Sequence, residues 1–386
     1  MDYLEQSFDV HFNYRVYFTT GIFDEGNKDF ALFLKQNKEE RVLQKMLFII
    51  DEGVVKAYSL LFEQIRSYFK NSPVSLVENI LVIPGGERAK NNSKYLDSII
   101  EAIDVHRIDR HSYVAAIGGG SVLDVAGFAS AVAHRGIKHI RIPTTVLSQN
   151  DSGVGVKNGI NYNGKKNFIG TFAPPVAVFN DDLFLETLSE RDWRSGISEA
   201  IKVALIKDAD FFYWIEKNVE KLVSRNREIM NLLIRRCAAL HLQHIASRDP
   251  FELGSSRPLD FGHWSAHKME QLSGFRILHG EAVAMGIALD SYYSALSGRL
   301  SMEKADTIIQ LFLKLGFEIT SPLLDIQNEN SEILKGLEEF REHLGGLLTI
   351  MLLRDIGVGE EVHDLDIQLL KEASQKLGEY QHQLSK

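Results

Sequence analysis

YVAAIGGGSVLD, residues 113–124, is the stretch that decides the fold. A run of small and β-branched apolar residues ends in three glycines, Gly118, Gly119 and Gly120, and a helical pattern containing Asp124 follows at once. A buried strand that turns into a helix over glycines is typical of parallel sheets covered by helices. The free amides of such a helix start suit a phosphate, although a tight turn without any ligand fits these residues equally well.

The same succession of strand, turn and helix recurs on both sides of this stretch. Further apolar runs lie at 45–50, 80–83 and 140–142, and helical patterns lie at 54–69 and 93–103. We therefore expect an α/β N-terminal domain with a Rossmann-like parallel sheet. Asp51, at the end of the first run, either accepts hydrogen bonds from ribose hydroxyls or caps the following helix.

From about Leu183 the apolar residues recur at helical spacing. The expected helices are 194–207, 211–225, 229–246, 263–272, 281–296 and 301–315. The sequence thus predicts two domains, an α/β domain at 1–182 and a mostly α-helical domain at 183–386.

Composition excludes several classes of protein. The chain has 386 residues and a formal net charge of −9, so nucleic acid, which needs a dense basic surface, is not the expected partner. Cys237 is the only cysteine, which excludes an intrachain disulfide and any cysteine-built metal site. A metal would need His, Asp and Glu, and 13 histidines are present. No signal peptide and no membrane-spanning run is visible, so we expect a cytoplasmic protein with no membrane partner.

Histidines and one carboxylate form a candidate metal site. His263 and His267 are spaced i, i+4 on one helix face, and His279 opens the next helix. Glu199 sits in an otherwise apolar helical stretch, where an unpaired carboxylate is costly. One Glu and two His with an open position form a normal catalytic zinc set, and Lys202 lies one turn from Glu199. Each histidine alone is more often a core or surface residue.

A basic, glycine-rich segment lies within this acidic chain. Arg135, Lys157, Lys165 and Lys166 are interleaved with glycines, as expected of a loop or hairpin that receives an anion such as phosphate. A solvated basic turn is an equally good interpretation. Asp151, beside these residues, is either an acceptor for a substrate hydroxyl or an internal ion-pair partner.

Taken in order, these motifs resemble those of 3-dehydroquinate synthase within the sugar-phosphate cyclase superfamily, over roughly residues 45–357. The matching motifs are Pro84-Gly-Gly-Glu87-x-x-Lys90, Gly118-Gly-Gly-Ser-Val-Leu-Asp124, Arg135-Gly136, Pro143-Thr144-Thr145 through Asp151, Gly155-Val-Lys157-Asn-Gly, Gly164-Lys-Lys166-Asn167, Glu199-Ala-Ile-Lys202, Phe261-Gly-His263 and His279-Gly-Glu281. The pattern around 255–270 looks most like a branch found in eboshi-type operons, outside the shikimate pathway.

The resemblance implies a set of site residues. The implied NAD-binding residues are Asp51, Glu87, Lys90, Gly118, Gly119, Gly120, Asp124, Thr144 and Thr145. The implied zinc ligands are Glu199, His263 and His279, with Co²⁺ as an alternative metal. The implied catalytic and substrate-contacting residues are Lys157, Lys202, His267, Asp151, Arg135, Lys166, Asn167 and Asp260. Arg135 matches an arginine that reaches the neighbouring subunit's site, which implies a homodimer, and His267 matches a histidine on the phosphate side.

The implied chemistry is a cyclase (lyase) reaction on a phosphorylated sugar. NAD oxidises a zinc-held hydroxyl, phosphate is eliminated, hydride returns, and an intramolecular aldol reaction closes a carbocycle. The lysines balance oxyanion and phosphate charge, and the substrate's own phosphate can serve as base.

The chain departs from the 3-dehydroquinate synthase pattern at the wall that faces the substrate. Ser256 replaces an arginine, Asp260 an asparagine and His241 a lysine, and Phe340-Arg341-Glu342 replaces a late Asp-Lys-Lys. An aspartate there repels a carboxylate, and each lost pair changes discrimination by a few kcal/mol. We therefore predict a substrate without a carboxylate, such as sedoheptulose 7-phosphate, although Arg257 could partly compensate.

Three alternatives remain open from the sequence. The first is a true 3-dehydroquinate synthase. The second is an NAD-dependent polyol dehydrogenase of the glycerol type, which performs net oxidation and does not need Lys157, Lys166 and Asn167 as a phosphate receptor. The third is a non-catalytic NAD-binding scaffold, which would have no reason to keep the metal residues and the lysines.

Overall fold

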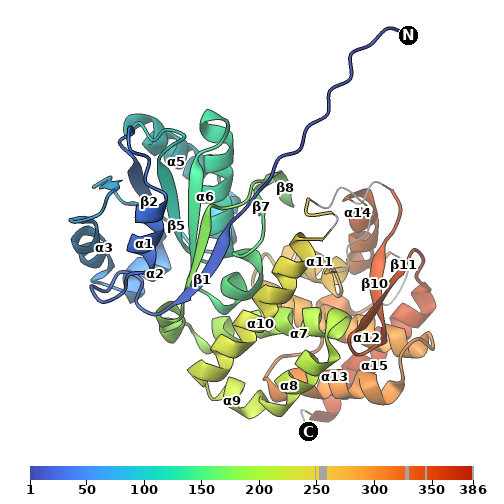
Figure 1. The fold of residues 1–386 in the computed structure, drawn as a ribbon. Coiled ribbons are helices and arrows are strands. Elements are labelled where there is room, and N and C mark those ends of the chain that lie inside the picture. Colours follow the sequence, from blue (N-terminus) through green and yellow to red (C-terminus); the bar gives the residue numbers. More distant parts are fainter. Residues whose placement is uncertain (248, 252–258, 327–329, 344–345, 385–386) are drawn as a thin grey trace. The chain divides into compact units, whose positions relative to one another are not determined.

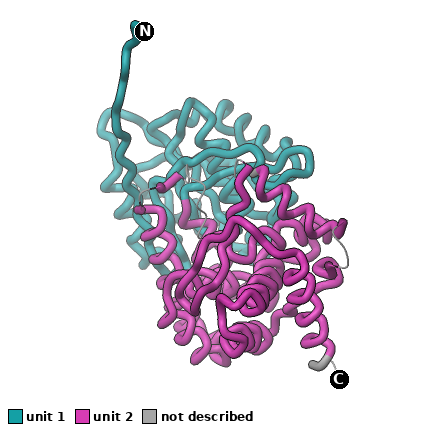
Figure 2. The backbone as a smooth tube through the Cα atoms, turned by 90° about the vertical axis from the view of Figure 1, so that its right-hand side faces the viewer, with its two compact units in different colours: residues 1–143, 156–181 teal, residues 144–155, 182–386 magenta. Residues whose placement is uncertain are grey.

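The computed structural model describes residues 1–247, 249–251, 259–326, 330–343 and 346–384. The chain divides into two compact units (Figure 2). Unit 1 comprises residues 1–143 and 156–181, and unit 2 comprises residues 144–155 and 182–386. The segment 144–155, which the sequence analysis placed in the N-terminal half, thus belongs to the second unit.

Unit 1 is built on a parallel sheet (Figure 1). Among the described residues this sheet has seven strands in the order β1-β9-β6-β5-β2-β3, with β4 also paired to β2. The strands are β1 (Arg15–Thr19), β2 (Lys45–Asp51), β3 (Ser75–Leu76), β4 (Leu81–Ile83), β5 (Tyr113–Gly118), β6 (Lys138–Pro143) and β9 (Ala177–Asp181). Every pairing in the sheet is parallel, as the apolar runs predict.

Alternate residues of the central strands pack on the two faces of the sheet. Leu47 and Val114 join an aliphatic core with α5 (Ser93–Val105) and α6 (Gly120–Val132). Phe48 packs instead against Phe69 of α3 (Leu61–Phe69), with ring centroids 5.6 Å apart. Helix α1 (Asp29–Gln36) adds Phe30 to this aromatic layer. Both faces are therefore covered, which confirms the predicted fold class.

The helix expected over 54–69 is two helices. Helix α2 (Glu52–Ala57) buries no side chain, whereas α3 buries Leu61, Ile65 and Phe69. A turn separates them, closed by a 3.1 Å hydrogen bond from the Leu61 amide to the Tyr58 carbonyl. The turn re-aims the chain so that the apolar stripe of α3 faces the sheet, a tertiary effect that periodicity alone does not reveal.

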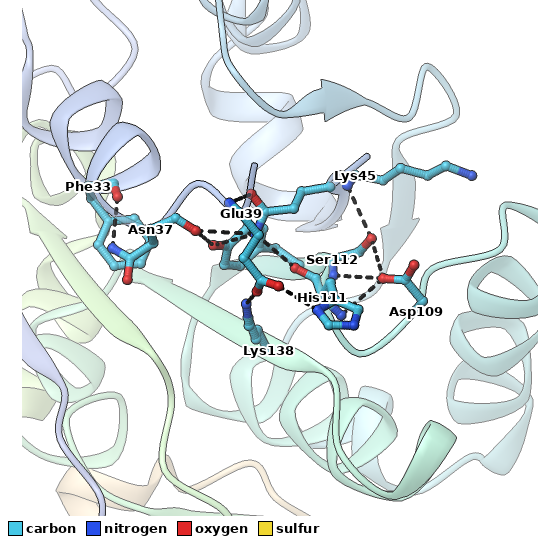
Figure 3. Close-up of polar contacts among 10 residues, drawn as sticks. Phe33, Asn37, Glu39, Lys45, Asp109, His111, Ser112 and Lys138 are labelled. Carbon is cyan, nitrogen blue, oxygen red and sulfur yellow. Dashed lines mark hydrogen bonds and ion pairs between the residues drawn. The ribbon is translucent and has the colours of Figure 1, made fainter. Parts of the chain in front are cut away.

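A polar network holds the sheet together where its strands begin (Figure 3). The carboxylate of Glu39 accepts from Lys138 Nζ at 2.5 Å and contacts His111 Nδ1 at 2.7 Å. Next to His111, the Ser112 amide and hydroxyl both donate to Asp109 Oδ1 at 2.9 Å. We call Glu39, His111 and Lys138 the Glu39 cluster. It ties the start of β6 to the loops before β2 and β5.

A hairpin outside the main sheet completes unit 1. Strands β7 (Lys157–Tyr162) and β8 (Lys165–Phe172) pair antiparallel, and the turn between them contains Gly164 at φ 76°. The basic glycine-rich segment is thus a hairpin, one of the two forms expected from its sequence. Next to it in the chain, residues 148–152 form a π-helix, η2 (Ser148–Ser152), which belongs to unit 2.

Unit 2 is mostly helical, as expected. Its longer elements are α7 (Glu190–Lys207), α8 (Ala209–Lys217), α9 (Val219–Val223), α10 (Arg227–Ile245), α11 (His263–Leu272), α12 (His279–Leu296), α13 (Met302–Lys314), α14 (Lys335–His343), β10 (Ile350–Asp355), β11 (Val358–Val362) and α15 (Ile367–Leu384). The helix expected over 211–225 is interrupted at Asn218, which ends α8 and begins α9. In the part of the chain that the structure describes, no helix is both long and apolar enough to cross a membrane.

Candidate active site

Unit 2 brings Glu199 together with two histidines from different helices. Glu199 lies in the middle of α7, His263 is the first residue of α11 and His279 the first residue of α12. Glu199 Oε1 is 3.5 Å from His263 Nε2 and 3.3 Å from His279 Nε2, and its Oε2 is 2.5 Å from Lys202 Nζ. We call Glu199, Lys202, His263 and His279 the Glu199 cluster.

Close helix packing sets these distances. Helices α7 and α12 approach so tightly that a Cβ on Gly280 would overlap the carbonyl of Ser195. The amide of Gly280 also donates to Ser195 Oγ at 3.2 Å. Because His279 precedes Gly280 and Glu199 lies one turn after Ser195, this contact holds the ligand atoms of the two helices at a fixed separation.

The charge on Glu199 is compensated inside the protein. Its side chain is completely buried, and apart from the ion pair of Oε2 with Lys202 the carboxylate oxygens have no hydrogen-bond partner among the described residues. Burial alone would raise the pKa of Glu199, but Lys202 and the two histidines outweigh it and hold that pKa well below its usual range. Burial would likewise lower the pKa of Lys202, yet Glu199 and Asp151 outweigh it and raise that pKa. The carboxylate is therefore a buried anion with open lone pairs.

Both histidines present Nε2 as a ligand atom. His263 Nδ1 is 3.0 Å from the carbonyl of Phe261, and His279 Nδ1 is 3.0 Å from Glu270 Oε2. An acceptor beside Nδ1 fixes the ring proton on that nitrogen. Nε2 then carries a lone pair, which faces Glu199. One oxygen of Glu199 and these two nitrogens all lie within 4.8 Å of one another. This donor set, with Glu199 Oε1 facing both nitrogens, fits a tetrahedral zinc ion with an open fourth position.

His267 lies beside the cluster. Its ring centroid is 5.3 Å from that of His263 and 5.9 Å from that of His279, so the i, i+4 spacing does place the two α11 histidines on one face. His267 and Glu270 form a second group with His279 in which three ligand atoms lie within 4.8 Å. The shared His279 makes this group part of the same site.

Two more of the candidate residues lie near Lys202. Asp151 and Asp260 both act to raise the pKa of Lys202 electrostatically. Asp151 lies on η2, and its Oδ1 is 3.3 Å from Nδ1 of His241 on α10. Asp151 thus has an internal partner, as one of the two interpretations held, but this partner is a histidine whose pKa is lowered by burial. Ser256 and Arg257 lie outside the described residues.

In unit 1, Asp51 lies beside the glycine-rich turn. Its carboxylate accepts from the Gly53 amide at 2.7 Å and so caps α2, which bears out the capping interpretation. A Cβ on Gly85 would overlap this carboxylate. Burial raises the pKa of Asp51, against the opposing effect of amides that include that of Gly119. The N-cap of α6 is Gly119, which offers no side chain to the first amides, so this helix start fits a cofactor phosphate.

Five further candidates of unit 1, Glu87, Lys90, Asp124, Lys166 and Asn167, lie close together. Lys90 Nζ is 2.7 Å from Asp124 Oδ2 and also donates to Asn167 Oδ1. Glu87 Oε1 is 3.5 Å from Lys166 Nζ. The short helix α4 (Glu87–Lys90) thereby connects residues expected to contact NAD with residues expected to contact phosphate.

The other candidates, Lys157, Arg135, Thr144 and Thr145, differ in burial and in their contacts. Lys157 is exposed at the start of β7, where its carbonyl accepts from the buried Arg141 at 2.9 Å. Arg135 is exposed in the single chain and has φ 61°. Thr144 is buried, and the hydroxyl of Thr145, just before the helical segment, is 2.8 Å from that of Ser148.

Sequence reasoning missed two supporting carboxylates. Glu270 contacts Nδ1 of His279 and orients its ring. Asp290 accepts hydrogen bonds from the Gly262 amide and from Trp264 Nε1, both at 3.0 Å, and these bonds fix the start of α11. Burial raises the pKa of Asp290 to about 7. The available signal is that Asp290 interrupts an otherwise apolar helix face, as Glu199 does, and that Glu270 follows His267 by one helical turn.

Comparisons with known proteins agree with this arrangement. Residues 80–195 match the family model described as 3-dehydroquinate synthase N-terminal, and residues 196–337 match that described as 3-dehydroquinate synthase C-terminal. The 3-dehydroquinate synthase of Dictyoglomus turgidum is 33% identical over 354 residues, which cover 90% of this chain and 97% of the relative. The chain belongs to the 3-dehydroquinate synthase family.

Solved structures place this 3-dehydroquinate synthase family member among sugar-phosphate cyclases. The 2-epi-5-epi-valiolone synthase of Streptomyces hygroscopicus, with NAD⁺ and Zn²⁺ bound, superposes with a TM-score of 0.87 at 27% identity, covering 98% of this chain and 100% of that one. A 2-deoxy-scyllo-inosose synthase complexed with carbaglucose-6-phosphate, NAD⁺ and Co²⁺ has a TM-score of 0.76 at 22% identity, with coverage of 94% and 96%, and shares the fold.

Proposed function

We propose that this chain is an NAD- and zinc-dependent sugar-phosphate cyclase whose substrate is a heptulose phosphate without a carboxylate. The observation that carries the proposal is the buried Glu199 carboxylate, with two histidine nitrogens 3.3 and 3.5 Å from one of its oxygens. A family of cyclases supplies the reaction class. The proposed sequence is transient oxidation, phosphate elimination, re-reduction and intramolecular aldol closure.

Each residue of unit 2 has a distinct proposed task. Glu199, His263 and His279 would hold zinc, and bound NAD and zinc supply reversible hydride transfer and Lewis-acid polarisation of a substrate oxygen. Lys202 is positively charged and buried, so it balances negative charge that develops on a substrate oxygen nearby. His267 is proposed on the phosphate side, and Asp151 as an acceptor for a substrate hydroxyl.

The residues of unit 1 are proposed to bind the cofactor and the phosphate. Asp51 would accept from ribose hydroxyls with its outer lone pairs, while the turn at Gly118, Gly119 and Gly120 takes the cofactor phosphates. Glu87, Lys90 and Asp124, with Thr144 and Thr145 of unit 2, complete the proposed cofactor set. Lys157, Lys166 and Asn167 are proposed to contact the substrate, and Arg135 to reach a neighbouring subunit in a homodimer.

Charge supports a substrate without a carboxylate. Asp260 lies close enough to Lys202 to influence it electrostatically, and an aspartate at this place repels a substrate carboxylate. The lost arginine at Ser256 points the same way, although that residue lies outside the described ranges. The assignment to the eboshi-operon-type branch stays a prediction.

A true 3-dehydroquinate synthase is the second candidate. It is favoured by the 33% identity to a relative of that name over 90% of this chain. The two candidates differ in their substrates, so turnover decides between them.

The test follows phosphate release from two sugars. Purified protein with NAD⁺ and Zn²⁺ is supplied with sedoheptulose 7-phosphate or with a heptulosonate 7-phosphate, which carries a carboxylate. We expect release from the first with catalytic amounts of NAD⁺ and no net NADH. Preference for the carboxylated sugar would establish the second candidate, whereas accumulating NADH with a simple polyol would indicate a dehydrogenase. Release of phosphate from neither sugar would defeat the proposal.

A further inference from the structure

His241 is a buried histidine with one nitrogen beside a carboxylate and the other without a hydrogen-bond partner among the described residues. It lies on α10, one turn after Cys237, and only 5% of its surface is exposed. Nδ1 is 3.3 Å from Asp151 Oδ1, whereas Nε2 is buried and has no hydrogen-bond partner within the described part of the chain. A buried polar atom without a partner is costly, so His241 Nε2 calls for a hydrogen-bonding group that the described residues do not supply.

The pairing with Asp151 decides what that group can be. A carboxylate only accepts hydrogen bonds, so the ring proton of His241 lies on Nδ1. Nε2 then carries a lone pair and accepts a hydrogen bond. Its partner is therefore a donor such as a hydroxyl, and a second lone pair at this place would be repelled.

The surroundings place His241 at the candidate active site. Lys202 and Glu199 both influence His241 electrostatically, as Asp151 does. Asp151 in turn influences Lys202, so the pair His241–Asp151 and the Glu199 cluster form one group of interacting polar side chains. Cys237 is buried beside them and, because burial raises the pKa of its thiol, stays a neutral part of the wall.

We propose that His241 is a specificity-determining residue whose Nε2 accepts a hydrogen bond from a hydroxyl of the sugar phosphate. This inference rests on the proposed function and extends it, since it names the residue that selects a hydroxyl over a carboxylate. Asp151 then acts as a positioning residue that fixes the tautomer of His241.

The experiment measures binding without turnover. The zinc-loaded protein is saturated with NADH, which cannot oxidise the sugar, and is titrated calorimetrically with sedoheptulose 7-phosphate and with a heptulosonate 7-phosphate. We expect the wild type to bind the first at least about 10-fold more tightly. His241→Leu should lower the affinity for sedoheptulose 7-phosphate about 10-fold or more. It should change the affinity for the heptulosonate 7-phosphate by less than about threefold.

Two further variants separate recognition from folding. His241→Gln keeps an amide acceptor near the position of Nε2 and should restore the preference for sedoheptulose 7-phosphate to within about threefold of the wild type. Asp151→Asn can either donate to Nδ1 or accept from it, so the ring proton is no longer fixed on Nδ1 and the preference for sedoheptulose 7-phosphate should fall.

Several outcomes would overturn the inference. One is that His241→Leu lowers the affinity for both sugars equally, which is expected if His241 is only structural or if a water molecule binds Nε2. Another is that the wild type binds neither sugar, or binds both alike. Failure of the proposed function is distinguishable, because it appears as absent phosphate release with NAD⁺ while the binding preference and its response to His241 variants persist.

Discussion

Two clusters in this molecule are built from the same residue types and differ in what surrounds them. Glu39 contacts a lysine at 2.5 Å and a histidine at 2.7 Å, and 37% of its side chain is exposed. Glu199 contacts a lysine at 2.5 Å and two histidines at 3.3 and 3.5 Å, with no exposure. Water can satisfy the first carboxylate, whereas the second depends on what the protein or a ligand offers. The comparison teaches that burial and unsatisfied lone pairs, rather than composition or distance, mark a candidate site.

The largest effect is expected at Glu199. In Glu199→Gln the buried Lys202 faces a neutral amide, so we expect a loss of about 3–5 kcal/mol in unfolding free energy. Zinc content should fall from near one ion per chain to near zero, and turnover should be lost with it. Elemental analysis and urea unfolding measure the two effects. Retention of stoichiometric zinc by this variant would show that Glu199 is not a ligand.

Asp290 offers a third type of carboxylate, buried like Glu199 but without a cation beside it. Burial raises its folded pKa from 3.8 to about 7. The folded state therefore holds the proton more tightly than the unfolded state, so its stabilising contribution is full below about pH 4 and is lost as pH rises through 7. The change is up to about 4 kcal/mol.

This pH dependence is measured by urea unfolding between pH 5 and pH 8. The wild type should lose stability over this range relative to Asp290→Asn, in which the titrating group is absent. Identical pH profiles for the two proteins would show that Asp290 does not titrate in this window.

A smaller effect is expected at Glu270, which touches the cluster only through His279. Glu270→Ala removes the acceptor that orients His279 Nδ1, so zinc affinity should fall about 10–100-fold. Glu270→Gln, whose amide oxygen can still accept a hydrogen bond from His279, should lose less zinc affinity. Competition with a zinc chelator measures the affinities, and Glu228→Gln, at an exposed position of α10, serves as the control. Equal affinities in Glu270→Ala and the control would remove Glu270 from the site.

The smallest effect is expected in the Glu39 cluster. Glu39→Gln should leave zinc content and turnover unchanged and move the unfolding midpoint by no more than about 2 °C, because water replaces the lost ion pairs. Unfolding in 1 M salt is the complementary measurement, since screening should remove what difference remains. A large destabilisation would erase the distinction between the two clusters.

Local sequence patterns predicted much of the fold and the central residues of the candidate site. The apolar runs predicted the parallel sheet because buried parallel strands need continuous hydrophobic residues. Glu199 stood out because a carboxylate interrupts an apolar helix face. The i, i+4 spacing placed His263 and His267 on one face, which their ring distance of 5.3 Å confirms.

Other features depend on contacts that no local pattern records. The pairing of Asp151 with His241 joins residues that are 90 positions apart, and it exists because η2 and α10 pack together. The break between α2 and α3 follows from how α3 reaches the sheet. The segment 144–155 belongs to unit 2 although its strand-like neighbours belong to unit 1.

The backbone contact between Gly280 and Ser195 has a consequence for redesign. Since two main chains meet there, the spacing of the ligand-bearing helices does not depend on how nearby side chains repack. Mutations at His241, Asp151 or Asp260 therefore leave the main-chain spacing of these helices in place, while they change the charge around Lys202. Such a protein is a suitable starting point for directed evolution, because the positions of its candidate metal ligands are set by the main chain rather than by the side chains to be varied.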